Sequence, residues 1–520
     1  MKTKYIFMLM LGMLFIISTG CEDRLDIAKH GNMGSQEDFY QTDDDAMQAL
    51  ASLYNSWGGN YFNWFFAKNL LADDIWCGGG SRGDNASMEQ LNEYTFDTDH
   101  GMVEGIYSGM YGVIYKANLI IDLMEPDTEV KRRAIAEAKF FRAWSHFELV
   151  TLFGTAPVVD HLLAPGEYRM SNGSPETTWA FIESDLSEII NSNELPSKAN
   201  MDDSATAIRV TKEVAQAMLG KAYLFQGKYG EAASMLDKVI DSGKYGLYQG
   251  EYDMVLHVAA NGSRESMLEV QKRNDSEQAW TQMTMTFLMQ GWRSDKLNMS
   301  AAASSYLASG TYGFMNPRKG LYDAFVAMEG ENGYRLQGSI RTAAQMADLG
   351  VTIQTGASMV GHEGLFMWKN RALKEDCVYD ASYFQALQYI NLRVMRYAEV
   401  LLLAAEAHVQ SGGGKALNYI NQIRSRAKLP ALTSVTLDDV KKEKRLELCL
   451  ESVRYQDLVR WGDAETVLAN QGKEISAYSA AGVEVLFTNS TYGFKAKHKL
   501  LPIPLKEIEL NPNMEQNTGW

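Results

Sequence analysis

Aromatic and polar residues in predicted loops are the first candidates for a chemical role. Trp76 follows the acidic pair Asp73-Asp74 and precedes Gly78-Gly79-Gly80, so hydrogen-bond acceptors would flank its ring and no side chain would cover it. Aromatic faces stack on the apolar faces of sugar rings, while carboxylates and amides bind the hydroxyls. The pattern predicts an exposed platform at Trp76. If a sugar stacks there, Trp76→Ala should weaken its binding without changing the thermal midpoint.

Other loop residues could complete such a site. Trp292 beside Arg293 is the second candidate platform, and Asn85 could supply an amide to a hydroxyl. Most tryptophans of a soluble protein pack in its interior, so most of these aromatic residues are expected to be buried. The remaining candidates are loop aromatics and one amide, namely Trp57, Tyr61, Trp64, Trp280, Tyr306, Tyr312 and Asn316.

Two other patterns could serve catalysis. Residues 79–83 spell G-x-S-x-G, the letters of a nucleophile elbow, which needs a buried strand before it and a helix after it. The surrounding glycines predict a loop instead. Glu443, Glu447 and Glu451 share one helix face, and paired carboxylates hydrolyse glycosides. Basic residues beside them favour a structural ion-pair ladder. No enzymatic activity is therefore expected, and a lipid-anchored glycoside hydrolase is the least favoured function.

No pattern predicts a metal ion or a cofactor. The eight histidines include no pair four residues apart, and no calcium-loop spacing follows Asp43-Asp44-Asp45. That acidic run is better explained as the first turn of a helix. Cys449 lies among helical leucines and is expected to be a buried thiol. A disulfide between Cys77 and Cys377 stays open.

Helical periodicity predicts the scaffold that positions the loops. Residues 210–243 match the tetratricopeptide pattern in order and spacing, with glycines where two helices approach and turn. Four helix pairs are expected: 44–57 with 104–124, 129–153 with 175–192, 212–226 with 229–242, and 393–410 with 415–427. A further single helix is expected over 437–461. The fold class is mainly α, with a tetratricopeptide-like scaffold over about 44–242 and 391–461. A loop-rich lobe would cover 58–103 and 245–390, and an irregular segment 462–520.

The N-terminus predicts export and lipid anchoring. Lys2 and Lys4 precede an apolar stretch, residues 5–17, that is too short to span a bilayer. Residues 18–21 then resemble a lipobox, in which the Cys21 thiol is acylated. An ordinary secretory signal with an incidental cysteine is the alternative. Residues 1–20 are thus the expected signal peptide and 21–520 the mature chain. A net charge of −16 argues against nucleic-acid binding.

Several segments together resemble the SusD/RagB family of outer-membrane nutrient-binding lipoproteins. The sequence departs from the family pattern at Ser452, where glycine is usual, and at Thr518, where proline is frequent. The segments that carry the resemblance are residues 137–144 continuing to 153–157, residues 395–407, the acidic and basic series of 443–461, and residues 501–504, 507–508, 511–512 and 516–520.

The resemblance implies a fold, a location and partners. The fold would combine tetratricopeptide pairs with an irregular ligand-binding lobe. The protein would be non-enzymatic and lie on the outer face of the outer membrane, where Glu22-Asp23 resembles a surface-export signal. It would capture glycan and deliver it to a SusC-like TonB-dependent transporter. RagB-like members take peptides, so peptide capture is the alternative.

Overall fold

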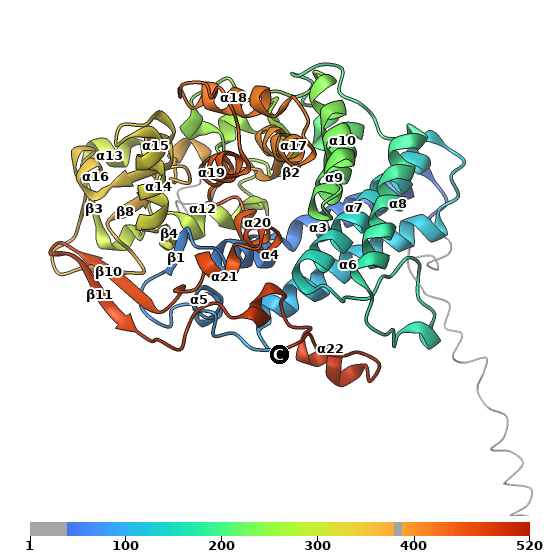
Figure 1. The fold of residues 1–520 in the computed structure, drawn as a ribbon, viewed down its shortest axis with the longest axis horizontal. Helices are drawn as coiled ribbons and strands as arrows, with labels where there is room; N and C mark the ends of the chain where they lie inside the picture. Colours follow the sequence, from blue (N-terminus) through green and yellow to red (C-terminus); the bar gives the residue numbers. More distant parts are fainter. Residues whose placement is uncertain (1–38, 379–386) are drawn as a thin grey trace, which may run out of the picture.

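The computed structural model describes residues 39–378 and 387–520. Helices dominate one side of the molecule, and short helices and strands form a loop-rich lobe on the other (Figure 1). The predicted signal peptide, lipobox, Cys21 and Glu22-Asp23 lie outside the described residues. Within those residues, no helix has the length and apolarity needed to cross a membrane.

The four predicted helix pairs are confirmed. In each pair the two helices pack against each other, and α10 also packs on α17, which joins the early and late parts of the scaffold. The pairs are α3 (Asp43–Gly59) with α6 (Gly101–Leu123), α7 (Glu129–Phe153) with α8 (Pro175–Ser192), α9 (Lys212–Phe225) with α10 (Tyr229–Asp241), and α17 (Tyr397–Ser411) with α18 (Ala416–Arg426).

Local sequence explains how these helices begin and approach. The acidic run caps α3, because Thr42 Oγ1 accepts a hydrogen bond from Asp45 N at 3.1 Å and the Asp45 carboxylate accepts one from Thr42 N at 2.8 Å. Gly220 lets α9 approach α10, since a Cβ there would lie 2.6 Å from Leu236 Cγ. The tetratricopeptide prediction for 210–243 is therefore confirmed.

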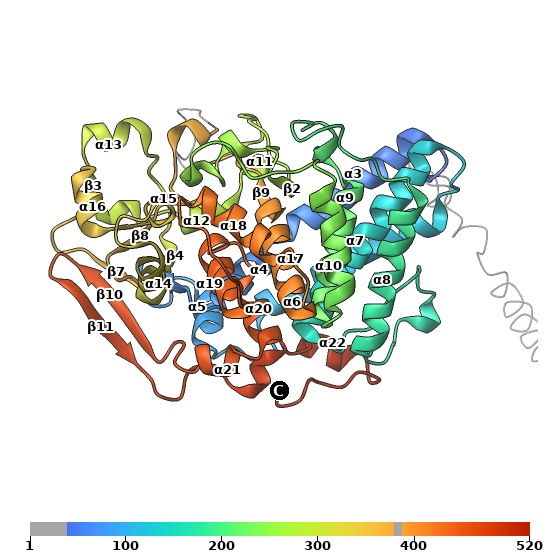
Figure 2. The same ribbon diagram turned by 45° about the horizontal axis from the view of Figure 1, so that its top comes forward.

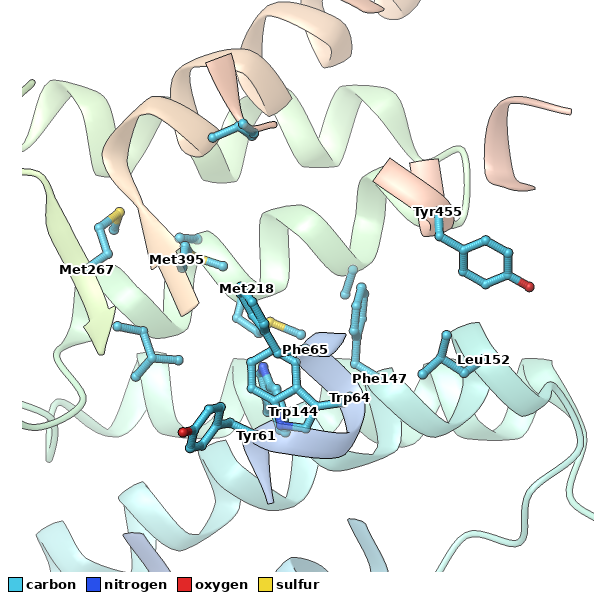
Figure 3. Close-up of a cluster of buried hydrophobic side chains, with 14 of the residues drawn as sticks. Tyr61, Trp64, Phe65, Trp144, Phe147, Leu152, Met218, Met267, Met395 and Tyr455 are labelled. Atoms are coloured by element: carbon cyan, nitrogen blue, oxygen red, sulfur yellow. The ribbon is translucent and has the colours of Figure 1, made fainter. Parts of the chain in front are cut away.

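An aromatic core lies where α4 (Tyr61–Leu70) crosses α7 (Figure 3). Trp64 and Trp144 meet edge to face with ring centroids 5.6 Å apart, a geometry that aromatic quadrupoles favour. Trp57, Tyr61 and Trp64 are all buried in this core. The prediction that they are loop platforms is wrong, because their segment forms helices whose aromatic sides face inward.

Three predicted boundaries are wrong. Residues 58–103 are not one loop, because α4, β1 (Ile75–Gly78) and α5 (Ala86–Glu93) lie within them. The helix expected from 393 begins at Tyr397, after strand β9 (Leu392–Arg396), which pairs antiparallel with β2 (Ser266–Val270).

The helix expected over 437–461 is two helices, α19 (Leu437–Glu447) and α20 (Arg454–Trp461). Leu450 and Ser452 between them have φ of +66° and +60°, which interrupts a right-handed helix. The left-handed conformation at 452 also explains why glycine suits this position.

Residues 245–378, 387–390 and 462–520 form short helices and strands joined by loops. The α-helices described in this part run from four to eleven residues. β10 and β11 form a hairpin that extends along one edge of the molecule, and β10 also pairs with β7 to make a three-stranded sheet (Figure 2). The elements are α11 (Ala279–Gln282), α12 (Met285–Gln290), β3 (Leu297–Met299), α13 (Ala301–Tyr306), β4 (Phe314–Pro317), α14 (Lys319–Glu329), α15 (Tyr334–Ser339), β5 (Ile340–Thr342), α16 (Ala343–Asp348), β6 (Val351–Ile353), β7 (Ser358–Val360), β8 (Leu365–Met367), α21 (Ala464–Val467), β10 (Glu474–Ser479), β11 (Gly482–Thr488) and α22 (Leu505–Leu510).

The acidic ladder of 443–451 is structural, as predicted, but its partners lie far away in the sequence. Its carboxylates pair with Arg335, Lys369, Arg396 and Arg426 rather than with the basic residues beside them. These contacts join α19 to α15 and β9, so buried charge connects the scaffold to the lobe. Burial opposes ionisation of Glu447, yet Arg426, Arg396 and Arg335 lower its pKa to about 2.

We expect this network to make the folded protein less stable in acid. The folded pKa of Glu447 lies below its ordinary value, so its contribution is fully present above about pH 4.5 and is lost as the pH falls toward 2, a change of about 3 kcal/mol. Urea unfolding at several pH values should show a midpoint that falls over this window, and Glu447→Gln should have a shallower fall. A midpoint independent of pH between 5 and 2.5 would contradict this.

The cysteines settle the disulfide question. Cys77 and Cys377 are free and buried, so the pairing left open by the sequence does not form. Cys449 is a buried thiol as predicted, and burial raises its pKa to about 11. The described residues also hold no group of three or more His, Cys, Asp or Glu that could bind a metal ion.

Candidate functional site

Trp76, the first predicted platform, is an interior residue. Strand β1 turns it inward, and 6 % of its surface is exposed. Its indole nitrogen donates to Glu363 at 3.0 Å, and the Arg318 guanidinium lies 3.7 Å from the ring centroid. Because protein groups cover the ring, the prediction of an exposed platform at Trp76 is wrong.

The two carboxylates before Trp76, those of Asp73 and Asp74, also form ion pairs within the protein. Asp73 accepts from Arg454 at 2.8 Å, and Asp74 accepts from Arg445 at 2.8 Å. Burial acts to raise the pKa of both carboxylates. For Asp73 the charges of Arg454 and Arg445 outweigh burial, so its pKa is lowered. For Asp74 burial outweighs the arginines, so its pKa is raised. These carboxylates fix the turn after α4 to α19 and α20, so they do not face a ligand.

Trp292 is likewise part of a core, that of the loop-rich lobe. It is 6 % exposed, donates from its indole nitrogen to the Met367 carbonyl at 2.9 Å, and stacks on Trp368 with centroids 5.9 Å apart. The second predicted platform is therefore also wrong. Among the other candidates, Asn316 is buried and donates to the carbonyls of Gly313 and Gly361.

Several predicted loop segments meet at the glycine loop, residues 78–80, and form one polar surface. Arg293 reaches three segments: it pairs with Asp295 at 2.8 Å, donates to the Tyr312 carbonyl at 3.2 Å, and lies 3.7 Å from Asp84. Asp84 in turn accepts from Gly80 N at 2.6 Å.

The remaining polar groups of this surface hold the loop in place. Lys296 donates to the Gly80 carbonyl at 2.7 Å. Asn85 caps α5 by accepting from Met88 N. Ser81, the serine of the G-x-S-x-G letters, is exposed in the turns between β1 and α5, so the loop interpretation is confirmed. This surface is polar, and its two tryptophans point inward.

Among the candidate ligand-binding tryptophans, Trp280 is the one with an exposed side chain. It lies on α11 with 52 % of its surface exposed. The next two residues, Thr281 and Gln282, line a cavity of about 410 Å³ together with Asn55 and Gln271. We call this cavity the Trp280 pocket. Tyr306 is 38 % exposed and Tyr312 is half-buried, on other segments of the same lobe.

Three distant segments build the Trp280 pocket. The end of α3 meets the end of β2 closely, because a Cβ on Gly58 would lie 2.9 Å from Val270 Cγ1. β2 then continues into Gln271 and Lys272, and α11 closes the third side. The resulting lining carries amide, hydroxyl, carboxylate and ammonium groups, which are group types that bind sugar hydroxyls. Trp280 is not a lining residue, but it directly precedes Thr281 in α11 and offers an exposed indole of the kind that stacks on sugar faces.

Lys272 places a positive charge in this pocket. Its ammonium donates to the Thr281 carbonyl at 3.2 Å and lies 5.9 Å from the Tyr61 ring centroid. It forms no ion pair with any residue that the structure describes, and burial lowers its pKa. A ligand oxygen would therefore find an uncommitted donor here.

Sequence reasoning missed Asn55, Gln271, Lys272 and Gln282. Asn55 lies in a predicted helix, Gln271 and Lys272 follow β2, and Gln282 ends α11, so these residues come together only after folding. The signal that could have found them was the exposed Trp280 with polar residues on both sides, but the same pattern surrounds tryptophans that proved to be buried.

Comparisons with known proteins match most of the chain. A family model described as "SusD family" matches residues 269–520, and one described as "Starch-binding associating with outer membrane" matches residues 36–224. The chain is 25% identical over 576 residues to the "Starch-binding protein SusD" of Bacteroides thetaiotaomicron, covering 100% of both chains. It is 24% identical over 492 residues to a "SusD-like protein" of Bacteroides ovatus, covering 89% of this chain and 83% of the relative.

Solved structures share the fold. A "Laminarin binding SusD-like protein" superimposes with a TM-score of 0.78 at 28% identity, covering 92% of this chain and 100% of the other. "Surface glycan-binding protein A" of Bacteroides thetaiotaomicron, in complex with laminarihexaose, gives a TM-score of 0.73 at 22% identity, covering 91% and 99%. The tetratricopeptide pairs, the loop-rich lobe and these matches together place the chain in the SusD family.

Proposed function

We propose that this protein is a cell-surface glycan-binding lipoprotein. It captures an oligosaccharide or polysaccharide in its loop-rich lobe and delivers it to a SusC-like TonB-dependent transporter of the outer membrane. Membership of the SusD family supports the class of function and the association with the outer membrane. The transporter partner and the lipid anchor at Cys21 are parts of the proposal.

The observation that carries the ligand site is the Trp280 pocket. The cavity of about 410 Å³ offers the amides of Asn55 and Gln282 and the ammonium of Lys272 on its wall, and the half-exposed Trp280 directly precedes the lining residues Thr281 and Gln282 in α11. A sugar could stack on Trp280 and exchange hydrogen bonds with these groups. Laminarin is the first glycan to test, because a structural relative at 28% identity carries that ligand in its name.

The proposal makes no use of catalysis. The carboxylates that could form a hydrolytic pair, Glu443, Glu447 and Glu451, are buried and ion-paired with arginine or lysine. Binding without cleavage is the expected behaviour. Peptide capture remains the competing outcome, and a peptide panel run beside the glycan panel separates the two.

Trp280→Ala should weaken glycan binding by roughly two- to tenfold, since a stacked aromatic contributes about 0.5–1.5 kcal/mol beyond its buried area. The thermal midpoint should stay within about 1 °C of wild type, because a half-exposed side chain leaves no core cavity. Isothermal titration with the best glycan of a panel, and differential scanning calorimetry, provide the two readings.

Tyr115→Ala is the matched control for this experiment. Tyr115 is 54 % exposed and lies on α6, which contributes no residue to the Trp280 pocket, so its loss removes a similar exposed ring far from the lining. It should leave the affinity unchanged. Equal affinities for Trp280→Ala and wild type would place the ligand elsewhere in the lobe.

Cys21→Ala should release the protein from the membrane fraction. The prediction follows from the position of Cys21 directly after the apolar stretch of the signal, where acylation would supply the membrane affinity. Fractionation of cells that lack the partner transporter checks it, because a bound transporter could retain the protein. A variant that stays in the membrane at the wild-type level there would refute the anchor.

A further inference from the structure

A second polar cavity lies beneath α6, where the C-terminal helix α22 meets the loop that follows α7. It has a volume of about 280 Å³ and is lined by Tyr107 and Tyr111 of α6, Tyr168 of the loop, and Glu507 and Asn511 of the C-terminal segment. We call it the Glu507 pocket. It shares no lining residue with the Trp280 pocket, and Figure 2 shows α22 and α11 at opposite edges of the molecule.

Glu507 differs from the other carboxylates described above. Its side chain is half-buried, yet it forms no hydrogen bond and no ion pair with any residue in 39–378 or 387–520. Lys506 next to it pairs instead with Glu104, at 3.6 Å. Burial raises the pKa of Glu507, the charge of Lys506 acts in the opposite direction, and the negative charge of Glu104 again raises it. A cation bound directly at the carboxylate would favour its charged form.

Two other polar groups of the cavity donate hydrogen bonds to backbone carbonyls. The Asn511 amide donates to the Met170 carbonyl at 2.7 Å, and the Tyr111 hydroxyl donates to the Pro157 carbonyl at 2.7 Å. These contacts fix the walls, whereas the Glu507 carboxylate has no hydrogen bond or ion pair with a residue that the structure describes. In the ion-pair network of α19, by contrast, each buried carboxylate has at least one arginine or lysine.

Aromatic rings complete the lining. Tyr107 and Tyr111 lie with ring centroids 4.9 Å apart, and Tyr168 at the rim is 63 % exposed. A carboxylate among tyrosine rings is the arrangement that binds ammonium groups, because the ring faces and the carboxylate both attract positive charge. A volume at the lower end of ligand pockets suits one such group rather than a glycan chain.

We propose that the Glu507 pocket binds an ammonium group, carried either by an amino sugar or by a lysine side chain. Glu507 would accept the charged hydrogen bonds, and Tyr168 would cover the bound group. The inference does not depend on glycan capture at the Trp280 pocket, because the two sites are separate and different residues serve them.

The test uses the mature protein and two pairs of probes. Glucosamine and Nα-acetyl-lysine amide carry the ammonium group. Their N-acetylated counterparts, N-acetylglucosamine and Nα,Nε-diacetyl-lysine amide, lack it. Titration followed by NMR or calorimetry should show saturable binding of at least one ammonium probe and at least tenfold weaker binding of its counterpart. Binding of glucosamine alone identifies an amino-sugar site, and binding of the lysine probe alone identifies a polypeptide site.

Two variants assign the binding to this pocket. Glu507→Gln should reduce affinity for the ammonium probe at least tenfold, whereas Glu509→Gln, which removes an exposed charge from the same helix, should leave it unchanged. Tyr168→Ala should weaken binding severalfold with no loss of folding, since the ring is mostly exposed. Absence of saturable binding up to 10 mM, equal binding of the acetylated probes, or equal effects of the two glutamate variants would overturn the proposal. None of these results bears on glycan binding through Trp280.

Discussion

Arg396→Met is expected to lower the free energy of unfolding by about 3–5 kcal/mol, because it leaves buried carboxylates without their counter-charge. Arg396 is almost fully buried and pairs with Glu265 at 2.6 Å, Glu447 at 2.7 Å and Glu451 at 2.6 Å. It also donates to the Glu447 carbonyl at 2.7 Å. Methionine restores much of the volume but supplies no donor, so the acidic groups must take up protons or lose their packing.

Because of where Arg396 lies, its loss should destabilise more than one contact. It ends β9 and precedes α17, so its pairs hold the lobe strand, the scaffold helix and the segment after α19 in one place. Arg335 and Lys369 pair with the same acidic series from the lobe. Loss of the central cation should therefore loosen the junction between scaffold and lobe.

Urea unfolding of Arg396→Met and wild type measures this effect. Arg273→Met is the control, since Arg273 is 65% exposed and pairs at the surface with Asp275, where an ion pair contributes about 0–1 kcal/mol. Comparable midpoints for Arg396→Met and Arg273→Met would show that the network is not a source of stability.

Trp76→Ala is expected to cost about 3–5 kcal/mol of stability, as truncation of a buried tryptophan does. This is the reverse of what the sequence predicts for an exposed platform. The buried ring covers the Arg318 guanidinium, which has no ion pair with a described residue and donates to the Ile75 carbonyl at 2.7 Å. Alanine would leave a cavity and uncover that cation.

Trp76→Phe separates the two contributions. Phenylalanine keeps a ring under Arg318 but loses the hydrogen bond to Glu363, so a smaller loss, of about 1–2 kcal/mol, is expected. Thermal and urea unfolding of both variants provide the measurement. If Trp76→Ala unfolds at the wild-type midpoint and binds glycan more weakly, the ring is a platform after all and the interior position is wrong.

The scaffold could be predicted from the sequence because its signals are local. The 3.6-residue period, Ser174 before Pro175, and the Thr42 and Asp45 cap all act within a few residues. The bend between α19 and α20 could not be predicted, because it depends on residues with a left-handed backbone conformation, which helical periodicity does not reveal. The ion pairs of Glu447 were also hidden, since their partners lie in other elements.

The candidate site was harder to predict because exposure is a tertiary property. Trp76, Trp292 and Trp280 all have polar residues near them in the sequence, yet Arg318 covers the first, Trp368 stacks on the second, and the third is exposed. The polar residues around Arg293 stay a prediction as ligand contacts, whereas the two tryptophans near them are buried. The Trp280 pocket could not be predicted either, because it forms only where the ends of α3 and β2 meet in the folded protein.

The central claim is that the protein binds glycan and does not cleave it. Isothermal titration of the mature protein with laminarin and a panel of other glycans, with reducing ends assayed in the same samples after incubation, tests it most directly. We predict saturable binding to at least one glycan with reducing ends unchanged, and weaker binding of that glycan by Trp280→Ala. New reducing ends, or saturable binding only to peptides, would contradict the account.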